Sequence, residues 1–140
     1  MTPKKTYIDS GVLFAAFRGE EPLSLRAYRF LDSSDHQFVS SLFVRLEVLP
    51  KAIYHQQQEE VEFHETFFAA VSDWAMDIES VTKNAYQLAC TYGLAAVDAL
   101  HIASALLLKA DEFITTEKPT KPMFRVTEIP VISILLLSAN

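Results

Sequence analysis

Hydrophobic and polar positions along the chain switch between strand-like and helical spacing. A short β-prone run at 6–8 stops at polar residues, and an apolar run resumes at 12–17, which predicts a strand, a turn and a helix. Further strands are predicted at 37–40, 78–81, 112–115 and either 124–127 or 131–134. Further helices are predicted at 22–31, 42–53, 59–74, 84–92 and 97–108. Alternating strands and helices predict a parallel sheet with helices on both faces.

Composition restricts the class of protein. The chain has 140 residues, half of them hydrophobic and only 3 of them glycine, which favours one domain over residues 1–140 and excludes a disordered or collagen-like chain. A lone cysteine, Cys90, excludes an intrachain disulfide and fits a reducing compartment, and we interpret it as a core residue. Apolar runs are too short for a membrane helix, and the N-terminus does not resemble a signal peptide. We therefore expect a cytoplasmic protein without a membrane partner.

Charge is distributed unevenly along the chain. The net charge is −6, and residues 59–79 contain seven acids and no Lys or Arg, so the remaining residues carry about +1, the difference between −6 and −7. Basic residues gather near the two ends of the chain. This distribution excludes a broad basic surface, and a polyanion would avoid the acidic middle and approach the basic ends.

Four acids occupy positions that a parallel sheet would bring together. Asp9 directly follows the first predicted strand, Glu47 lies on the helix after the second, Asp98 opens a nearly all-apolar helix, and Glu117 follows the 112–115 strand. Ligands of open α/β sheets sit outside the carboxyl ends of the strands. Close carboxylates raise one another's pKa, and a hard cation such as Mg²⁺ relieves their repulsion. The spacing therefore indicates a candidate metal site.

Each acid also has an ordinary structural interpretation. Asp9 and Asp98 are each placed to cap the helix that they open. Glu47 is four residues from Lys51, a spacing that allows an ion pair on one helix face. Glu117 is close in sequence to Lys118 and Lys121, with which a surface ion pair could form.

A histidine lies near one of these acids. His101 follows Asp98 by three residues on the same predicted helix, a spacing that would suit a metal ligand. The surrounding residues are apolar, so a buried, hydrogen-bonded core histidine is the favoured interpretation.

Four sequence blocks resemble one known family in the same order. They are YIDSGVL at 7–13, SSLFVRLEV at 40–48, GLAAVDALHIA at 93–103 and ADEFITTE at 110–117. Together they resemble the PIN-domain family, and within it the VapC-like ribonuclease toxins of type II toxin–antitoxin systems. The resemblance implies a three-layer α/β/α PIN-like domain with a central parallel sheet of four to five strands.

The resemblance also implies a function and a site. It implies a Mg²⁺- or Mn²⁺-dependent endoribonuclease whose catalytic and metal-binding acids are Asp9, Glu47, Asp98 and Glu117. Thr115 and Ser10 would support the site. The basic residues expected to contact RNA are Arg18, Arg26 and Lys118; a solvated surface is the alternative for the arginines. The implied partners are substrate RNA, a small antitoxin protein that inserts residues at the acidic site, and a second copy in a homodimer.

Two departures from the family pattern keep a second hypothesis open. Glu117 stands where the family usually has Asp, and Lys118 and Pro119 follow where many members have a further acid. The longer side chain moves its carboxylate outward, and Mg²⁺ demands near-ideal geometry. The alternative is a PIN scaffold with weak catalysis that acts as an RNA-binding or protein-interaction module.

Overall fold

The computed structural model describes residues 2–137 and is built on a five-stranded parallel sheet with the order β3-β2-β1-β4-β5. The strands are β1 (Lys4–Ile8), β2 (His36–Ser41), β3 (Asp73–Ala75), β4 (Glu112–Thr115) and β5 (Val131–Ser133). The helices are α1 (Ser10–Arg18), α2 (Leu23–Leu31), α3 (Leu42–Tyr54), α4 (Gln58–Ala70), α5 (Ile78–Tyr92) and α6 (Ala96–Leu107). Two 3₁₀ helices, η1 (Pro122–Arg125) and η2 (Ile134–Leu136), flank β5.

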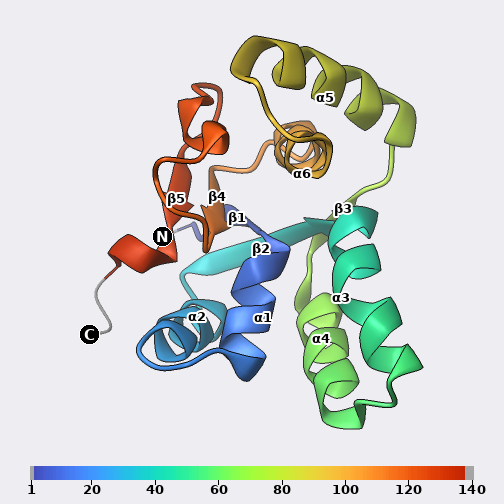
Figure 1. Cartoon of the computed structure of the whole chain (residues 1–140), viewed down its shortest axis with the longest axis vertical. Helices are drawn as coiled ribbons and strands as arrows, with labels where there is room; N and C mark the ends of the chain where they lie inside the picture. The colour runs from blue at the N-terminus through green and yellow to red at the C-terminus, as the bar shows by residue number, and fades with distance from the viewer. Residues whose placement is uncertain (1, 138–140) are drawn as a thin grey trace.

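Helices cover both faces of the sheet. Figure 1 shows α5 and α6 on one face and α1 and α2 on the other, with the α3–α4 pair beside α1. Because both faces are covered, the central strands are apolar on both sides, and Tyr7, Ile8, Phe113 and Ile114 are fully buried. The predicted three-layer α/β/α architecture with a parallel sheet of up to five strands is confirmed.

The strand order places the ends of β1 and β4 side by side. Ile8 pairs with Ile114, and the backbone N–H of Asp9 donates to the carbonyl of Ile114 at 2.9 Å. The sheet extends from β1 in both directions, with β2 on one side and β4 on the other. This change of direction is where open α/β sheets form ligand sites.

The predicted third strand at 78–81 and the end of the predicted 59–74 helix are wrong. Residues 78–81 form the first turn of α5, because Asp77 caps that helix by accepting from the backbone N–H of Ser80 at 3.1 Å. The third strand is instead β3, and α4 ends before it at Ala70. The backbone N–H of Ser72 donates a hydrogen bond to the carbonyl of Phe38 in β2, and β3 begins at the next residue and pairs with β2.

The C-terminal part resolves the two alternatives for the fifth strand. The strand falls within 131–134, whereas residues 122–125 form η1.

The interpretation of Cys90 as a core residue is wrong, because its side chain is exposed on α5.

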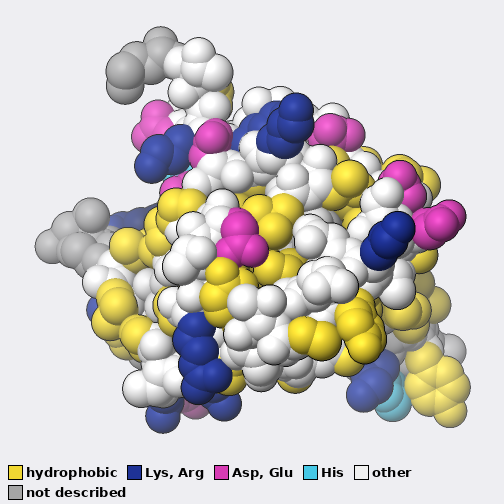
Figure 2. Space-filling model, turned by 90° about the horizontal axis from the view of Figure 1, so that it is seen from above, with side chains coloured by type: hydrophobic (Ala, Val, Ile, Leu, Met, Phe, Trp, Pro, Cys, Tyr) yellow, Lys and Arg dark blue, Asp and Glu magenta, His cyan; other side chains and the backbone are white. Residues whose placement is uncertain are grey.

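The surface formed by α5 differs from the acidic α4 region. Seen from above in Figure 2, its centre is mostly hydrophobic or uncharged, and charged side chains stand mainly around its periphery. Exposed hydrophobic side chains of α5 include Ile78 and Tyr86.

Within residues 2–137, no single helix is long and apolar enough to cross a bilayer; α5 and α6 pass that test only as a pair bent by 118°.

Candidate metal centre

Asp9 is held where β1 ends and α1 begins. One carboxylate oxygen, Oδ1, accepts from the backbone N–H of Ser10 at 2.9 Å, and Oδ2 accepts from the Thr115 hydroxyl at 2.8 Å. Asp9 therefore caps α1, as its structural interpretation predicted, and also faces the end of β4. Burial raises the pKa of Asp9 above its ordinary value, and the neighbouring His101 opposes that shift. Burial thus disfavours the ionised form of Asp9, and a nearby positive charge would stabilise it.

Glu47 reaches the same place from α3. Its Oε1 atom accepts from the hydroxyl of Ser10 and from Nε2 of His101, both at 2.6 Å. The hydrogen bond from His101 lowers the pKa of Glu47, against the opposing effect of partial burial. Within residues 2–137, Glu47 forms no ion pair with Lys51, so the alternative structural interpretation of this acid is not supported.

Asp98 approaches from the first turn of α6. The residue that caps α6 is Ala95, so Asp98 is not the helix cap. Its side chain is half-buried, and burial raises its pKa, with further increases from the negative charges of Asp9 and Glu117. The carboxylates of Asp9, Asp98 and Glu117, which come from three separate segments of the chain, therefore repel one another.

Glu117 follows β4 and is half-buried. Its backbone N–H donates to the Thr115 hydroxyl at 3.2 Å, and this same hydroxyl donates to Asp9. In the described part of the chain, Glu117 forms no ion pair with Lys118 or Lys121. Thr115 therefore links the fourth acid to the first.

His101 is both a core residue and a neighbour of the site. It is 1% exposed, its Nδ1 lies 2.8 Å from the Tyr7 hydroxyl, and its Nε2 lies 3.9 Å from Oδ1 of Asp9. The interpretation as a buried, hydrogen-bonded histidine is confirmed. Its contacts with Glu47 and Asp9 were not predicted, because the spacing from Asp98 indicates only a shared face of one helix and says nothing of residues on other elements.

The three predicted RNA contacts lie in different surroundings. Arg18 stacks its guanidinium 4.4 Å from the centre of the Phe14 ring and lies 3.8 Å from a carboxylate oxygen of Glu60. It also lines a cleft of about 280 Å³ whose other residues include Glu47. Arg26 is half-buried and donates to the carbonyl of Leu135 at 3.0 Å, whereas Lys118 is exposed beside Glu117.

The donor chemistry of the cluster fits a hard divalent cation. No Lys or Arg within residues 2–137 forms an ion pair with any of the four acids, and His101 contacts two of them, Asp9 and Glu47. Asp9, Glu47 and His101 each offer one ligand atom, and these atoms lie within 4.8 Å of one another. Carboxylate oxygens in excess suit Mg²⁺ or Mn²⁺.

Comparisons with known proteins identify the family and the fold. A family model described as the PIN domain matches residues 6–118. A toxin–antitoxin complex from Klebsiella pneumoniae has a chain with TM-score 0.68 and 21% identity, which covers 92% of this chain and 97% of its own. VapBC-1 from nontypeable Haemophilus influenzae gives TM-score 0.70 and 17% identity, with 94% and 98% covered.

A third solved structure has the same fold. FitAcB from Neisseria gonorrhoeae gives TM-score 0.62 and 19% identity, with 94% of this chain and 99% of the other covered. A search of curated protein sequences finds no significant match. At these identities the structural matches establish the fold, and the chemistry has to be argued from the side chains.

Proposed function

We propose that this chain, which belongs to the PIN domain family, is a metal-dependent endoribonuclease of the VapC-like toxin type. The observation that supports this proposal most strongly is the excess of carboxylates at the carboxyl ends of β1 and β4. Burial raises the pKa values of Asp9 and Asp98, yet no Lys or Arg within residues 2–137 pairs with either acid. A divalent cation would supply the missing positive charge.

The acids would share the cation in different ways. Asp9 and Asp98 would hold it most closely, with Glu47 and Glu117 completing the site directly or through water. When bound, the cation would activate water and stabilise the charge that develops on a phosphodiester. Thr115 fixes the rotamer of Asp9, and Ser10 contacts both Asp9 and Glu47. These contacts reduce the rearrangement that binding requires.

RNA would approach over basic residues that border the acids. Arg18 lies in the cleft beside Glu47, and its stacking on Phe14 orders the guanidinium in advance. Lys118 follows Glu117 directly, is exposed, and forms no ion pair within residues 2–137. Because Arg26 already donates to Leu135, we expect a smaller contribution from it.

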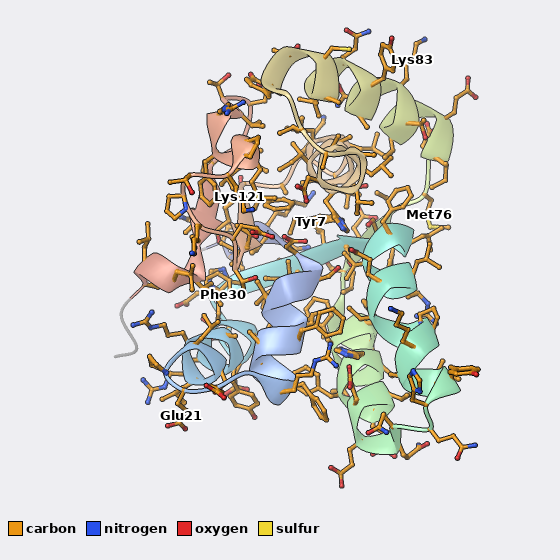
Figure 3. The ribbon with its side chains drawn as sticks, viewed as in Figure 1. Tyr7, Glu21, Phe30, Met76, Lys83 and Lys121 are labelled. Carbon is orange, nitrogen blue, oxygen red and sulfur yellow. The ribbon has the colours of Figure 1, made fainter. Side chains whose placement is uncertain are left out.

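RNA binding can be tested separately from cleavage. Arg18→Ala and Lys118→Ala should each weaken RNA binding and reduce the slope of log affinity against log salt by about 0.7 to 0.9. Arg26→Ala should have a smaller effect. Lys83→Ala is the matched control, because Lys83 lies on α5, away from the cluster (Figure 3). A larger loss for Lys83→Ala than for Arg18→Ala would show that RNA binds a different face.

The proposed protein partner is a small antitoxin that inserts residues at the acidic site, as the resemblance implies, and we propose that it also covers a second surface. An aromatic groove of about 480 Å³ is lined by Phe17, Phe63 and Phe67 together with acidic Glu59 and Glu62. Its composition fits a segment that combines apolar side chains with Lys or Arg. Two structurally similar proteins are a toxin–antitoxin complex from Klebsiella pneumoniae and VapBC-1 from nontypeable Haemophilus influenzae, which supports this partner class. We also propose a homodimer, as the resemblance implies.

Cleavage of a mixed-sequence RNA tests the proposed function. The parent protein should cleave with Mn²⁺ and should stop when EDTA is added. Asp9→Asn and Asp98→Asn should each abolish detectable cleavage while the fold is retained, because each removes a charge without opening a cavity. Cleavage that survives in both variants would contradict the proposal. A parent that binds Mn²⁺ and RNA without cleaving would favour the binding-module alternative.

A further inference from the structure

Tyr7 lies at the centre of the molecule and is connected to the candidate site through His101. It comes from β1, and Figure 3 shows it between the sheet and α6. Its ring is fully buried and stacks on Phe113, with ring centres 5.2 Å apart. Its hydroxyl lies 2.7 Å from Oγ of Ser41 and 2.8 Å from Nδ1 of His101. Nothing in the proposed metal binding requires a hydroxyl at this depth.

The hydrogen bonds continue from His101 to Glu47. A carboxylate accepts hydrogen bonds, so Nε2 of His101 must carry a hydrogen and donate a hydrogen bond to Oε1 of Glu47. The Tyr7 hydroxyl can donate to a neutral Nδ1 or accept from a protonated one, so it satisfies the ring in either state. Three buried side chains, Ser41, Tyr7 and His101, thus form a chain of hydrogen bonds that ends at Oε1 of Glu47.

The two oxygens of Glu47 have different surroundings. Oε1 accepts from both Ser10 and His101, whereas Oε2 accepts from no side chain or backbone group within residues 2–137. The Glu47 side chain is 40% exposed and has several rotatable bonds, so an unrestrained carboxylate would sample many orientations. Two donors on one oxygen select one orientation and leave the other oxygen available.

We propose that Tyr7 and His101 are positioning residues that hold Glu47 so that its Oε2 faces the cation or a cation-bound water. This inference rests on the proposed function, because it concerns the same acidic site. In this arrangement His101 is not itself a ligand, since Nε2 would have to release Glu47 to bind a cation. The pair instead connects the hydrophobic core to the site, so that packing against Phe113 fixes the orientation of an exposed acid.

A graded series at position 101 tests the inference. His101→Leu removes the donor to Glu47, whereas His101→Gln keeps a donor amide that can reach the same carboxylate. We expect His101→Leu to weaken Mn²⁺ affinity and kcat by about 10- to 100-fold, the range typical of residues that orient metal ligands. His101→Gln should retain a larger part of both. Tyr7→Phe keeps the stacked ring and should give a smaller loss in the same direction.

A double-mutant cycle separates positioning from general stability. His101→Leu should have its large effect on Mn²⁺ affinity in the parent and little effect in a Glu47→Ala background, because the carboxylate it orients is gone. A residue needed only for packing would cause the same loss in both backgrounds. Circular dichroism and thermal melts should first establish that the variants fold. If His101→Leu does not fold, Tyr7→Phe takes its place in the cycle.

Three results would overturn the inference. The first is parent-like Mn²⁺ affinity and kcat, within about twofold, in folded His101→Leu or Tyr7→Phe. The second is an equal loss in both backgrounds of the cycle. The third is nitrogen coupling from ¹⁵N-labelled histidine in the pulsed electron paramagnetic resonance spectrum of the Mn²⁺ complex, which would make His101 a ligand. A parent that neither binds Mn²⁺ nor cleaves RNA would refute the proposed function itself, and the positioning role with it.

Discussion

Acidic side chains at opposite edges of the same sheet, one buried at the amino edge and four at the carboxyl edge, differ in how their charges are balanced. At the amino edge, Glu112 accepts from the Thr6 hydroxyl at 2.8 Å, and its carboxylate lies 3.2 Å from Nδ1 of His36 and 3.7 Å from Nζ of Lys4. At the carboxyl edge, His101 lies beside Asp9 and Glu47, and within residues 2–137 neither Asp98 nor Glu117 forms an ion pair. The amino edge therefore has one acid with two basic partners, whereas the carboxyl edge has four acids and one basic side chain.

The difference shows which buried acids point to function. A buried carboxylate that is paired and hydrogen-bonded is compatible with a purely structural role. Glu60 on α4 is a second example, with His64 at 3.2 Å and Arg18 at 3.8 Å. Burial alone therefore does not distinguish a candidate site. The distinguishing property of the carboxyl edge is negative charge that the described residues do not balance.

The largest expected effect on stability is at the balanced edge. Glu112→Ala removes the acceptor of the Thr6 hydroxyl and the partner of His36, leaving buried polar groups unpaired. The free energy of unfolding should fall by about 1–3 kcal/mol. Asp98→Asn, at the other edge, should not lower it. Urea unfolding of the metal-free proteins measures both changes, and a larger loss for Asp98→Asn would show that the carboxyl edge is the structural one.

The pH dependence of stability should also differ within the carboxyl edge. The pKa of Asp98 is raised on folding, so its contribution to stability is complete below its unfolded pKa and is lost as pH rises through its folded pKa. Glu47 has a lowered pKa, so its contribution is complete above its unfolded pKa and is lost as pH falls through its folded pKa.

These signs give opposite outcomes for two variants of the metal-free protein. Asp98→Asn should be more stable than the parent at about pH 7, and Glu47→Gln should be less stable. The difference for Asp98→Asn should shrink as the pH is lowered toward about 4, the ordinary range of carboxyl pKa values, whereas the difference for Glu47→Gln should shrink only as the pH falls below that range. Thermal melts from about pH 7 to below about pH 4 are the measurement. Differences of the same sign for the two variants would contradict the assigned pKa shifts.

The smallest expected effect concerns the departure from the family pattern. Glu117→Asp restores the usual residue but draws the carboxylate back toward the backbone, whose N–H at this position is held by the Thr115 hydroxyl. We expect a loss of roughly tenfold or less in Mn²⁺ affinity and cleavage. Isothermal titration and RNA cleavage check it, with Glu117→Gln as the control for charge. A gain in both quantities would show that Glu117 is too long for the site.

The sequence pattern predicts the architecture well but places one strand wrongly. The helix at 97–108 and the strand at 112–115 are recognisable from the sequence because most of their side chains are apolar, as burial in the core requires. The third strand has only three residues, and its pairing with β2 depends on where α4 ends. Such a short element has no period of its own, whereas Ile78 to Val81 resembles a strand by composition and is made helical by the Asp77 cap.

The site is partly predictable for a similar reason. The positions of Asp9, Glu47, Asp98 and Glu117 relative to the predicted strands and helices indicate that the four acids could meet, and the resemblance to a known family gives these acids their expected roles. The contact between Glu47 and His101 depends on how α3 and α6 pack beside β1, which the pattern along one helix does not contain. Tyr7 lies two residues before Asp9 and so shares its side of the strand, but its hydrogen bond to His101 follows from packing alone.

Calorimetric titration with Mn²⁺ is the most direct test of the claim that unbalanced charge at the carboxyl edge marks a cation site. The parent and Glu112→Gln should bind Mn²⁺ with the same affinity, because the amino-edge cluster takes no part. The double variant Asp9→Asn, Asp98→Asn should show no binding while remaining folded. Undiminished binding in that double variant, or no binding by the parent, would contradict the account.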